Sequence, residues 1–167
     1  MPLMPVFVCA TLVIATTLMH YESLRIISAV IQRVTSHGRL RVLFSMFAIF
    51  AAHMLEIALY AIAYYLLRDE FGMGNFGGNF SNTFSTFLYF SAETFTSVGL
   101  GDIFPTGPLR MVCGIEALNG LLLIGWSASF TFVNMERFWR DDDADGSAKQ
   151  AAITAAPAAV NDDINLR

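Results

Sequence analysis

Charged side chains are scarce in this sequence. Asp, Glu, Lys and Arg make up 14% of its 167 residues, whereas hydrophobic residues make up 55%. Soluble domains usually carry about 25% charged residues, so this composition excludes an ordinary soluble domain and predicts a membrane protein. The net charge of −4 comes from aspartates gathered near the C-terminus, and it implies no nucleic-acid partner. These are Asp141, Asp142, Asp143, Asp145, Asp162 and Asp163.

Cysteine is also rare, and the motifs of enzymes are missing. Cys9 and Cys113 each lie in an apolar run, which gives no argument for a disulfide framework or a metal cluster and suits small buried side chains. No nucleophile motif and no phosphate-cradling loop is present, so we expect neither an enzyme nor a cofactor beyond transported ions. No span carries repeated arginines, which argues against a voltage sensor.

The N-terminal apolar run lacks a basic region before it and a clear cleavage site after it. A signal peptide is the alternative interpretation, but Pro2 and Pro5 suit the start of a helix. We therefore predict that residues 1–20 form a retained first transmembrane span.

Three apolar runs approach the roughly 20 residues that a helix needs to cross a bilayer. They are Met4–Met19, Val42–Leu67 and Met111–Met135. Residues 21–41 are predicted to form a cytoplasmic interfacial helix and linker, because Leu24, Ile27 and Ile31 recur at helical spacing in a segment that also carries polar residues. The sequence thus predicts an all-α membrane protein with three transmembrane helices.

The distribution of arginine predicts the orientation of these spans. Arginines gather after the first span and after the third, and cytoplasmic flanks are rich in basic residues. They are Arg25, Arg33, Arg39, Arg41, Arg137 and Arg140. The expected protein is a multi-pass cell-membrane protein with its N-terminus outside and its C-terminus cytoplasmic. Residues 140–167, acidic and then Ala-rich without an apolar face, are predicted to be disordered.

The external connection between the second and third spans has two parts. Residues 68–80 are Gly- and Asn-rich and are predicted to form an irregular turret. Residues 81–95 show helical spacing of Phe84, Phe87 and Ser91, with Ser81 or Asn82 as N-cap. A helix of this length spans about 20 Å, too short to cross the membrane, so we expect a re-entrant helix.

The segment after this helix, Thr96-Ser97-Val98-Gly99-Leu100-Gly101-Asp102, carries the chemistry. Irregular backbone at membrane depth is tolerated where it is buried in protein or lines a water-filled path. Glycine permits backbone angles forbidden to other residues, so successive carbonyl oxygens can point one way and replace the hydration shell of a cation. A lone Gly-x-Gly would indicate only a turn, but the preceding helix favours a pore.

Residues 90–105 resemble the pore region of the small bacterial two-transmembrane potassium channels, whose signature reads Thr-Val-Gly-Tyr-Gly-Asp. The resemblance covers residues 81 to about 138, and it implies a homotetramer in which four subunits surround one potassium pathway. It leaves any auxiliary subunit unknown. It divides residues 42–139 into outer helix 42–67, turret 68–80, pore helix 81–95, filter 96–102 and inner helix 110–138. By position, potassium would bind carbonyl groups of Ser97, Val98, Gly99 and Leu100, with Thr96 and Gly101 at the filter ends. The resemblance also suggests a bacterial inner membrane.

Several other residues match positions of that family. Glu93 and Asp102 would share a proton beside the filter, and Tyr89 and Phe90 would form an aromatic cuff around it. Gly120 is either a hinge of the inner helix or a site of close helix packing. Leu121, Ile124 and Ala128 would line the cavity.

Two departures affect selectivity. Ser97 replaces threonine and Leu100 replaces tyrosine, so a weakly selective cation channel and a non-conducting regulatory subunit remain alternatives to a potassium channel.

Polar residues inside the spans are a separate set of candidates. His53 and Glu56 lie on one face of the second span, and Glu116 and Asn119 lie three residues apart on the third. Pairs such as His53 or Glu56 with Glu116 would either sense pH or join the helices through hydrogen bonds.

Overall fold

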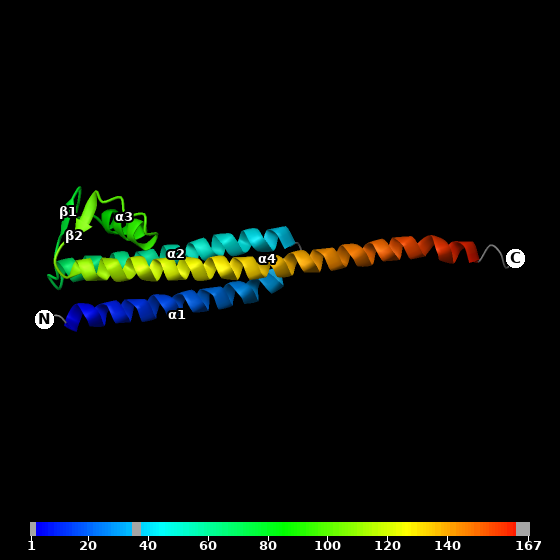
Figure 1. Cartoon of the computed structure of the whole chain (residues 1–167), viewed down its shortest axis with the longest axis horizontal. Helices are drawn as coiled ribbons and strands as arrows, with labels where there is room; N and C mark the ends of the chain where they lie inside the picture. Colours follow the sequence, from blue (N-terminus) through cyan, green and yellow to red (C-terminus); the bar gives the residue numbers. More distant parts are fainter. Residues whose placement is uncertain (1–2, 35–37, 163–167) are drawn as a thin grey trace.

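Three long helices dominate the computed structural model, which describes residues 3–34 and 38–162. They are α1 (Leu3–Val34), α2 (Gly38–Asp69) and α4 (Leu109–Asp162), and each contains a stretch apolar and long enough to cross a membrane. They run side by side in alternating directions (Figure 1). The protein is an all-α membrane protein with several spans, as the sequence predicted.

The connection between α2 and α4 folds into a compact unit at one end of the bundle. It contains β1 (Phe76–Gly78), the short helix α3 (Phe84–Phe95) and β2 (Ile103–Pro105). The N-terminal end of α1 lies at this same end of the molecule (Figure 1). Helix α3 begins after Thr83, so the predicted caps Ser81 and Asn82 lie two residues and one residue too early.

The first helix does not divide into a span and an interfacial segment, and that prediction is wrong. Helix α1 continues without a break to Val34, and its buried side chains form one stripe from Pro5 to Ile31. In its second half Leu24, Ile27 and Ile31 pack with Ile49 of α2. Their helical spacing therefore reflects burial against other helices and not contact with the membrane surface. Residues 35–37, part of the predicted linker, lie outside the described residues.

The turret is more regular than predicted. Strand β1 pairs antiparallel with β2, with Phe76 opposite Pro105 and Gly78 opposite Ile103. A Cβ atom at Gly78 would lie 2.0 Å from the Asp102 carbonyl oxygen, so glycine is required for the two strands to approach. The glycines that indicated an irregular loop permit this pairing.

The C-terminal segment also differs from the prediction. Helix α4 continues through Asp162 and extends well beyond the ends of α1 and α2 (Figure 1). Alanine is the strongest helix former, so this Ala-rich segment can be helical without an apolar face. The prediction of disorder is wrong for residues 140–162.

Candidate ion-conduction site

The backbone after α3 alternates in handedness. The φ angles of Ser97, Gly99 and Gly101 are 59°, 55° and 78°, and Ser97 is the one non-glycine residue of the described chain with positive φ. Val98 and Leu100 lie between them on the ordinary side of the Ramachandran map. This alternation turns successive peptide groups in the same direction.

Glu93 supports residues 97–101, an extended segment outside the two β-strands, which we call the filter strand. Its backbone oxygen accepts hydrogen bonds from the amides of Val98 at 2.9 Å and Gly99 at 3.2 Å. Its carboxylate accepts a third from the Leu100 amide, with Oε2 at 3.1 Å. One residue of the pore helix therefore satisfies three successive amide groups.

The carbonyl oxygens of this strand remain available. In the part of the chain that the structure describes, no hydrogen bond ends on the carbonyl oxygens of Ser97, Val98, Gly99 or Leu100. Residues 96–101 are exposed on the surface of the single subunit. A row of free carbonyl groups is suited to bind a dehydrated cation.

The two carboxylates near the filter have different partners. Burial raises the pKa of the Glu93 carboxyl and the charge of Asp102 raises it further, while the Leu100 hydrogen bond lowers it. The Asp102 carboxylate accepts a hydrogen bond from the Tyr89 hydroxyl at 3.2 Å. The predicted direct hydrogen bond between Glu93 and Asp102 is thus replaced by two separate bonds, one from the Leu100 amide to Glu93 and one from the Tyr89 hydroxyl to Asp102.

Phe90 does not belong to a cuff around the filter. It is buried within its own subunit, where its ring packs edge-on against Tyr64 and Phe76. Phe80 and Phe87 complete this aromatic cluster, which joins the turret to α2 and α3. Of the two predicted cuff residues, only Tyr89 faces the filter exit, through its bond to Asp102.

Gly120 lies where α4 crosses the end of α3. A Cβ atom there would lie 2.1 Å from the Phe95 carbonyl oxygen, and α4 continues through this position as a helix. The geometry therefore favours close packing, one of the two interpretations that the sequence left open. Leu121, Ile124 and Ala128, the predicted cavity residues, are exposed on the following turns of α4.

The polar residues of the spans join the helices, in pairings that the sequence did not predict. Buried Glu116 accepts hydrogen bonds from Ser91 of α3 and Tyr64 of α2. Asn119 donates to Thr16 of α1 at 2.7 Å and to Tyr60 of α2 at 3.2 Å. The predicted pairing of Glu116 with His53 or Glu56 is not present.

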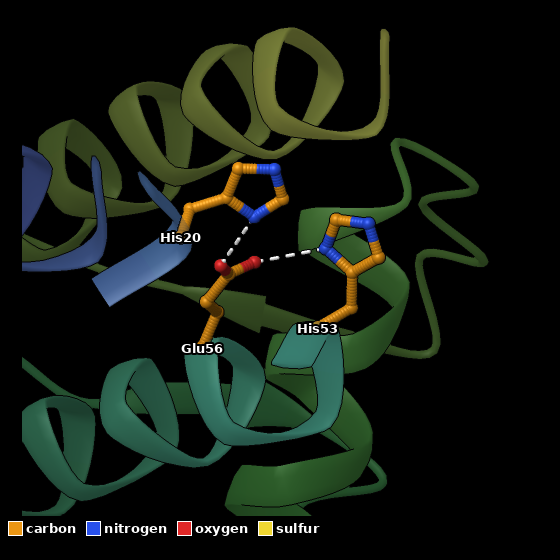
Figure 2. Close-up of side chains that lie close together, drawn as sticks. All are labelled: His20, His53 and Glu56. Carbon is orange, nitrogen blue, oxygen red and sulfur yellow. Dashed lines mark hydrogen bonds and ion pairs between the residues drawn. The ribbon is translucent and has the colours of Figure 1, made fainter. Parts of the chain in front are cut away.

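His53 and Glu56 instead meet His20, a residue that sequence reasoning missed. Glu56 lies between the two imidazoles, with each Nδ1 atom 2.8 Å from a different carboxylate oxygen (Figure 2). His20 and Glu56 are fully buried. His20 follows Thr16 by four residues, so both lie on one face of the helix, and that spacing could have identified His20. It was missed because the predicted apolar run ends at Met19, one residue earlier.

Comparison with known proteins places these features in a family. Residues 50–137, just over half of the chain, match the sequence model of a family described as ion channel. The chain belongs to this ion-channel family. The matched region of the channel runs from within α2 through α3 and the filter strand into α4, and it leaves α1 outside. No curated protein and no solved structure gives a significant match.

Proposed function

We propose that this channel subunit conducts potassium ions passively through a homotetrameric pore. The observation that carries the proposal is the filter strand, whose amides are bonded to Glu93 and whose carbonyl groups are free. The proposed ion ligands are the carbonyl oxygens of Ser97, Val98, Gly99 and Leu100.

The tetramer is proposed because one strand covers only one side of an ion. Val98 and Leu100 are 62% and 64% exposed in the single subunit, and the α4 residues Leu118, Leu121 and Leu122 are also exposed. Exposed filter backbone at membrane depth needs further protein or water around it. Four copies around one axis would supply both.

The proposed orientation places the turret and the N-terminus outside the cell and the C-terminus in the cytoplasm of a bacterial inner membrane. It is supported by the arginines that flank the other end of the bundle. The turret and the start of α1 lie together, as this orientation requires (Figure 1).

Flux through liposomes tests the proposal. Purified protein is expected to pass potassium down its gradient and to exclude sodium. Equal passage of both ions would instead support the weakly selective alternative, which Ser97 and Leu100 favour. The absence of any cation flux from correctly assembled tetramers would leave the non-conducting subunit as the better interpretation.

A further inference from the structure

His20, His53, Glu56 and Ser127 form a closed ring of four short contacts between α1, α2 and α4. Glu56 contacts the Nδ1 atoms of both histidines at 2.8 Å (Figure 2). On the opposite side, the Ser127 hydroxyl lies 3.2 Å from Nε2 of His20 and 3.1 Å from Nε2 of His53. The imidazole rings stack, with centroids 5.3 Å apart.

Each of these contacts needs one hydrogen atom. Without a hydrogen, two lone pairs would face each other, and with two hydrogens the atoms would collide. An ionised Glu56 supplies none, each neutral imidazole supplies one and Ser127 supplies one, which makes three hydrogens for four contacts. The complete ring therefore holds one additional proton, either as an imidazolium or as a protonated Glu56.

The charge of the ring leads to the same count. Glu56 with two neutral histidines would leave one uncompensated negative charge in a buried position between membrane helices, which is costly. The additional proton makes the ring neutral. We propose that His20, His53, Glu56 and Ser127 form a binding site for one exchangeable proton, and that the bound proton fastens α1 to the pore domain.

The surroundings of the ring support a proton in preference to a metal ion. The two Nδ1 atoms approach different carboxylate oxygens at a hydrogen-bonding distance, so each nitrogen lone-pair direction is already used by a proton. The neighbouring titratable groups have other partners: Tyr60 bonds to Asn119, and Glu116 bonds to Ser91 and Tyr64. Tyr21 of α1 packs on Trp126 of α4, and α3 contributes only the uncharged ring of Phe95.

The proton site also contacts the end of the pore helix α3, directly before the predicted filter. The His53 ring lies 5.7 Å from that of Phe95, the last residue of the pore helix, whose carbonyl group packs on Gly120. Loss of the proton would leave a repulsive contact at Ser127 and a net charge beside this junction. We therefore expect proton release to alter conduction, a consequence that rests on the proposed channel function, whereas the proton site itself does not.

Two substitutions change the hydrogen count in a defined way. In Glu56→Gln the amide donates one hydrogen and accepts one, so two neutral histidines complete a neutral ring without an additional proton. In Ser127→Ala the two contacts to the Nε2 atoms disappear, and two neutral imidazoles can donate both remaining hydrogen bonds to Glu56. Ser129→Ala is the matched control, because Ser129 is an exposed serine on the same helix that bonds only to the backbone of Gly125.

The experiment measures the thermal unfolding of the full chain in lipid nanodiscs from about pH 7 to about pH 9.5, above the range where free histidine titrates. There the folded ring holds one proton more than the unfolded chain, so the folding equilibrium of the wild type should weaken tenfold per pH unit until the ring releases its proton. This corresponds to a fall of about 3–5 °C in Tm per pH unit. Other titratable groups within the helices, Glu116, Cys9 and Cys113, are shared by all variants, so the slope is read as a difference between variants. Ser129→Ala should follow the wild type, and Glu56→Gln should lose this tenfold slope relative to the wild type. Ser127→Ala, in which only the charge of Glu56 still favours the additional proton, should lose it at lower pH.

The outcomes separate the proton site from the other interpretations. A flat wild-type curve, or Ser127→Ala identical to Ser129→Ala, would overturn the proposal even if Glu56→Gln fails to fold. A wild-type Tm that falls when a chelator removes bound metal would also overturn it, by assigning the cluster to a metal ion. The expected Tm pattern in protein that conducts no cation at any pH would reject the channel function and leave the proton site intact.

Discussion

At the scale of single residues, Glu93 supports the filter strand because it accepts hydrogen bonds from three consecutive amides. Two of these bonds use its backbone oxygen and survive substitution, whereas the bond from Leu100 depends on the carboxylate. Loss of an acceptor costs about 1–3 kcal/mol for a buried amide, and the partly buried Leu100 amide should lie at the lower end of this range. The sequence suggested a role for Glu93 from its position, but it did not identify Leu100 as the partner.

In the proposed tetrameric potassium channel, Glu93→Ala should therefore reduce potassium flux and tetramer stability. Glu93→Gln should retain most of both, because an amide oxygen still accepts the Leu100 hydrogen bond. Flux in liposomes and the melting of tetramers on gels measure the two effects. Glu70→Ala, which removes an exposed carboxylate from the end of α2, is the control. Equal losses in the Ala and Gln variants would show that charge, and not hydrogen bonding, is the important property.

Gly120→Ala tests whether Gly120 is a position of close helix packing or a hinge. The added methyl group meets the Phe95 carbonyl oxygen at 2.1 Å, and overpacking of this kind costs about 1–3 kcal/mol. Gly125→Ala has open space within the subunit and should instead favour the helix, by up to about 1 kcal/mol. Thermal unfolding in nanodiscs compares the two. A Gly120→Ala protein that is more stable than wild type would support the hinge interpretation.

At the scale of elements, the β1–β2 pair anchors the chain as it leaves the filter. The Asn79 amide donates to the Asp102 carbonyl oxygen at 2.8 Å, and Arg68 lies over the Phe80 ring at 4.6 Å. The turret is therefore attached to both α2 and the filter exit. We expect a disturbance of the turret to reach the filter through Asp102.

Gly78→Ala should separate the two strands, since its Cβ would lie 2.0 Å from the Asp102 carbonyl oxygen. Gly72→Ala is a matched control, because Gly72 also has positive φ but has nothing within 4 Å of its added Cβ. The control should lose about 1–2 kcal/mol from the left-handed backbone alone. Gly78→Ala should lose more and should change ion selectivity, which sodium and potassium flux would reveal. Equal behaviour of the two variants would contradict an anchoring role for the strand pair.

At the scale of the whole molecule, α1 is part of the folded channel subunit even though it lies outside the matched family region. It contributes Thr16 to the hydrogen bond of Asn119 and His20 to the proton site. Removing it would expose Asn119, Glu56 and Ser127 to lipid, where unsatisfied polar groups are costly.

Deletion of residues 1–34 should therefore lower the thermal stability and the yield of assembled tetramers, as measured by size-exclusion chromatography and unfolding in nanodiscs. Truncation after Gln150 is the comparison, because it shortens the part of α4 that extends beyond the other helices (Figure 1). That truncation should leave assembly unchanged. Normal tetramers with unchanged open probability after deletion of α1 would contradict this view of the first helix.

The sequence by itself determined the features that depend on residues close together along the chain. Apolar runs of sufficient length specify the three spans, the short segment before the filter specifies α3, and Gly99 and Gly101 specify an unusual backbone. These local properties were enough to predict an all-α membrane protein and its resemblance to channels, which the family match confirmed.

Tertiary structure alone decided which distant residues meet. The helical spacing of the apolar residues in α1 does not show whether lipid headgroups or other helices cover them. Packing against α2 and α4 made α1 one continuous span. Likewise, Glu56 could have faced several partners, and the alignment of α1 with α2 selected His20. Buried polar groups take the partners that the helix packing brings within reach, so their pairing follows from three-dimensional register and not from spacing along the chain.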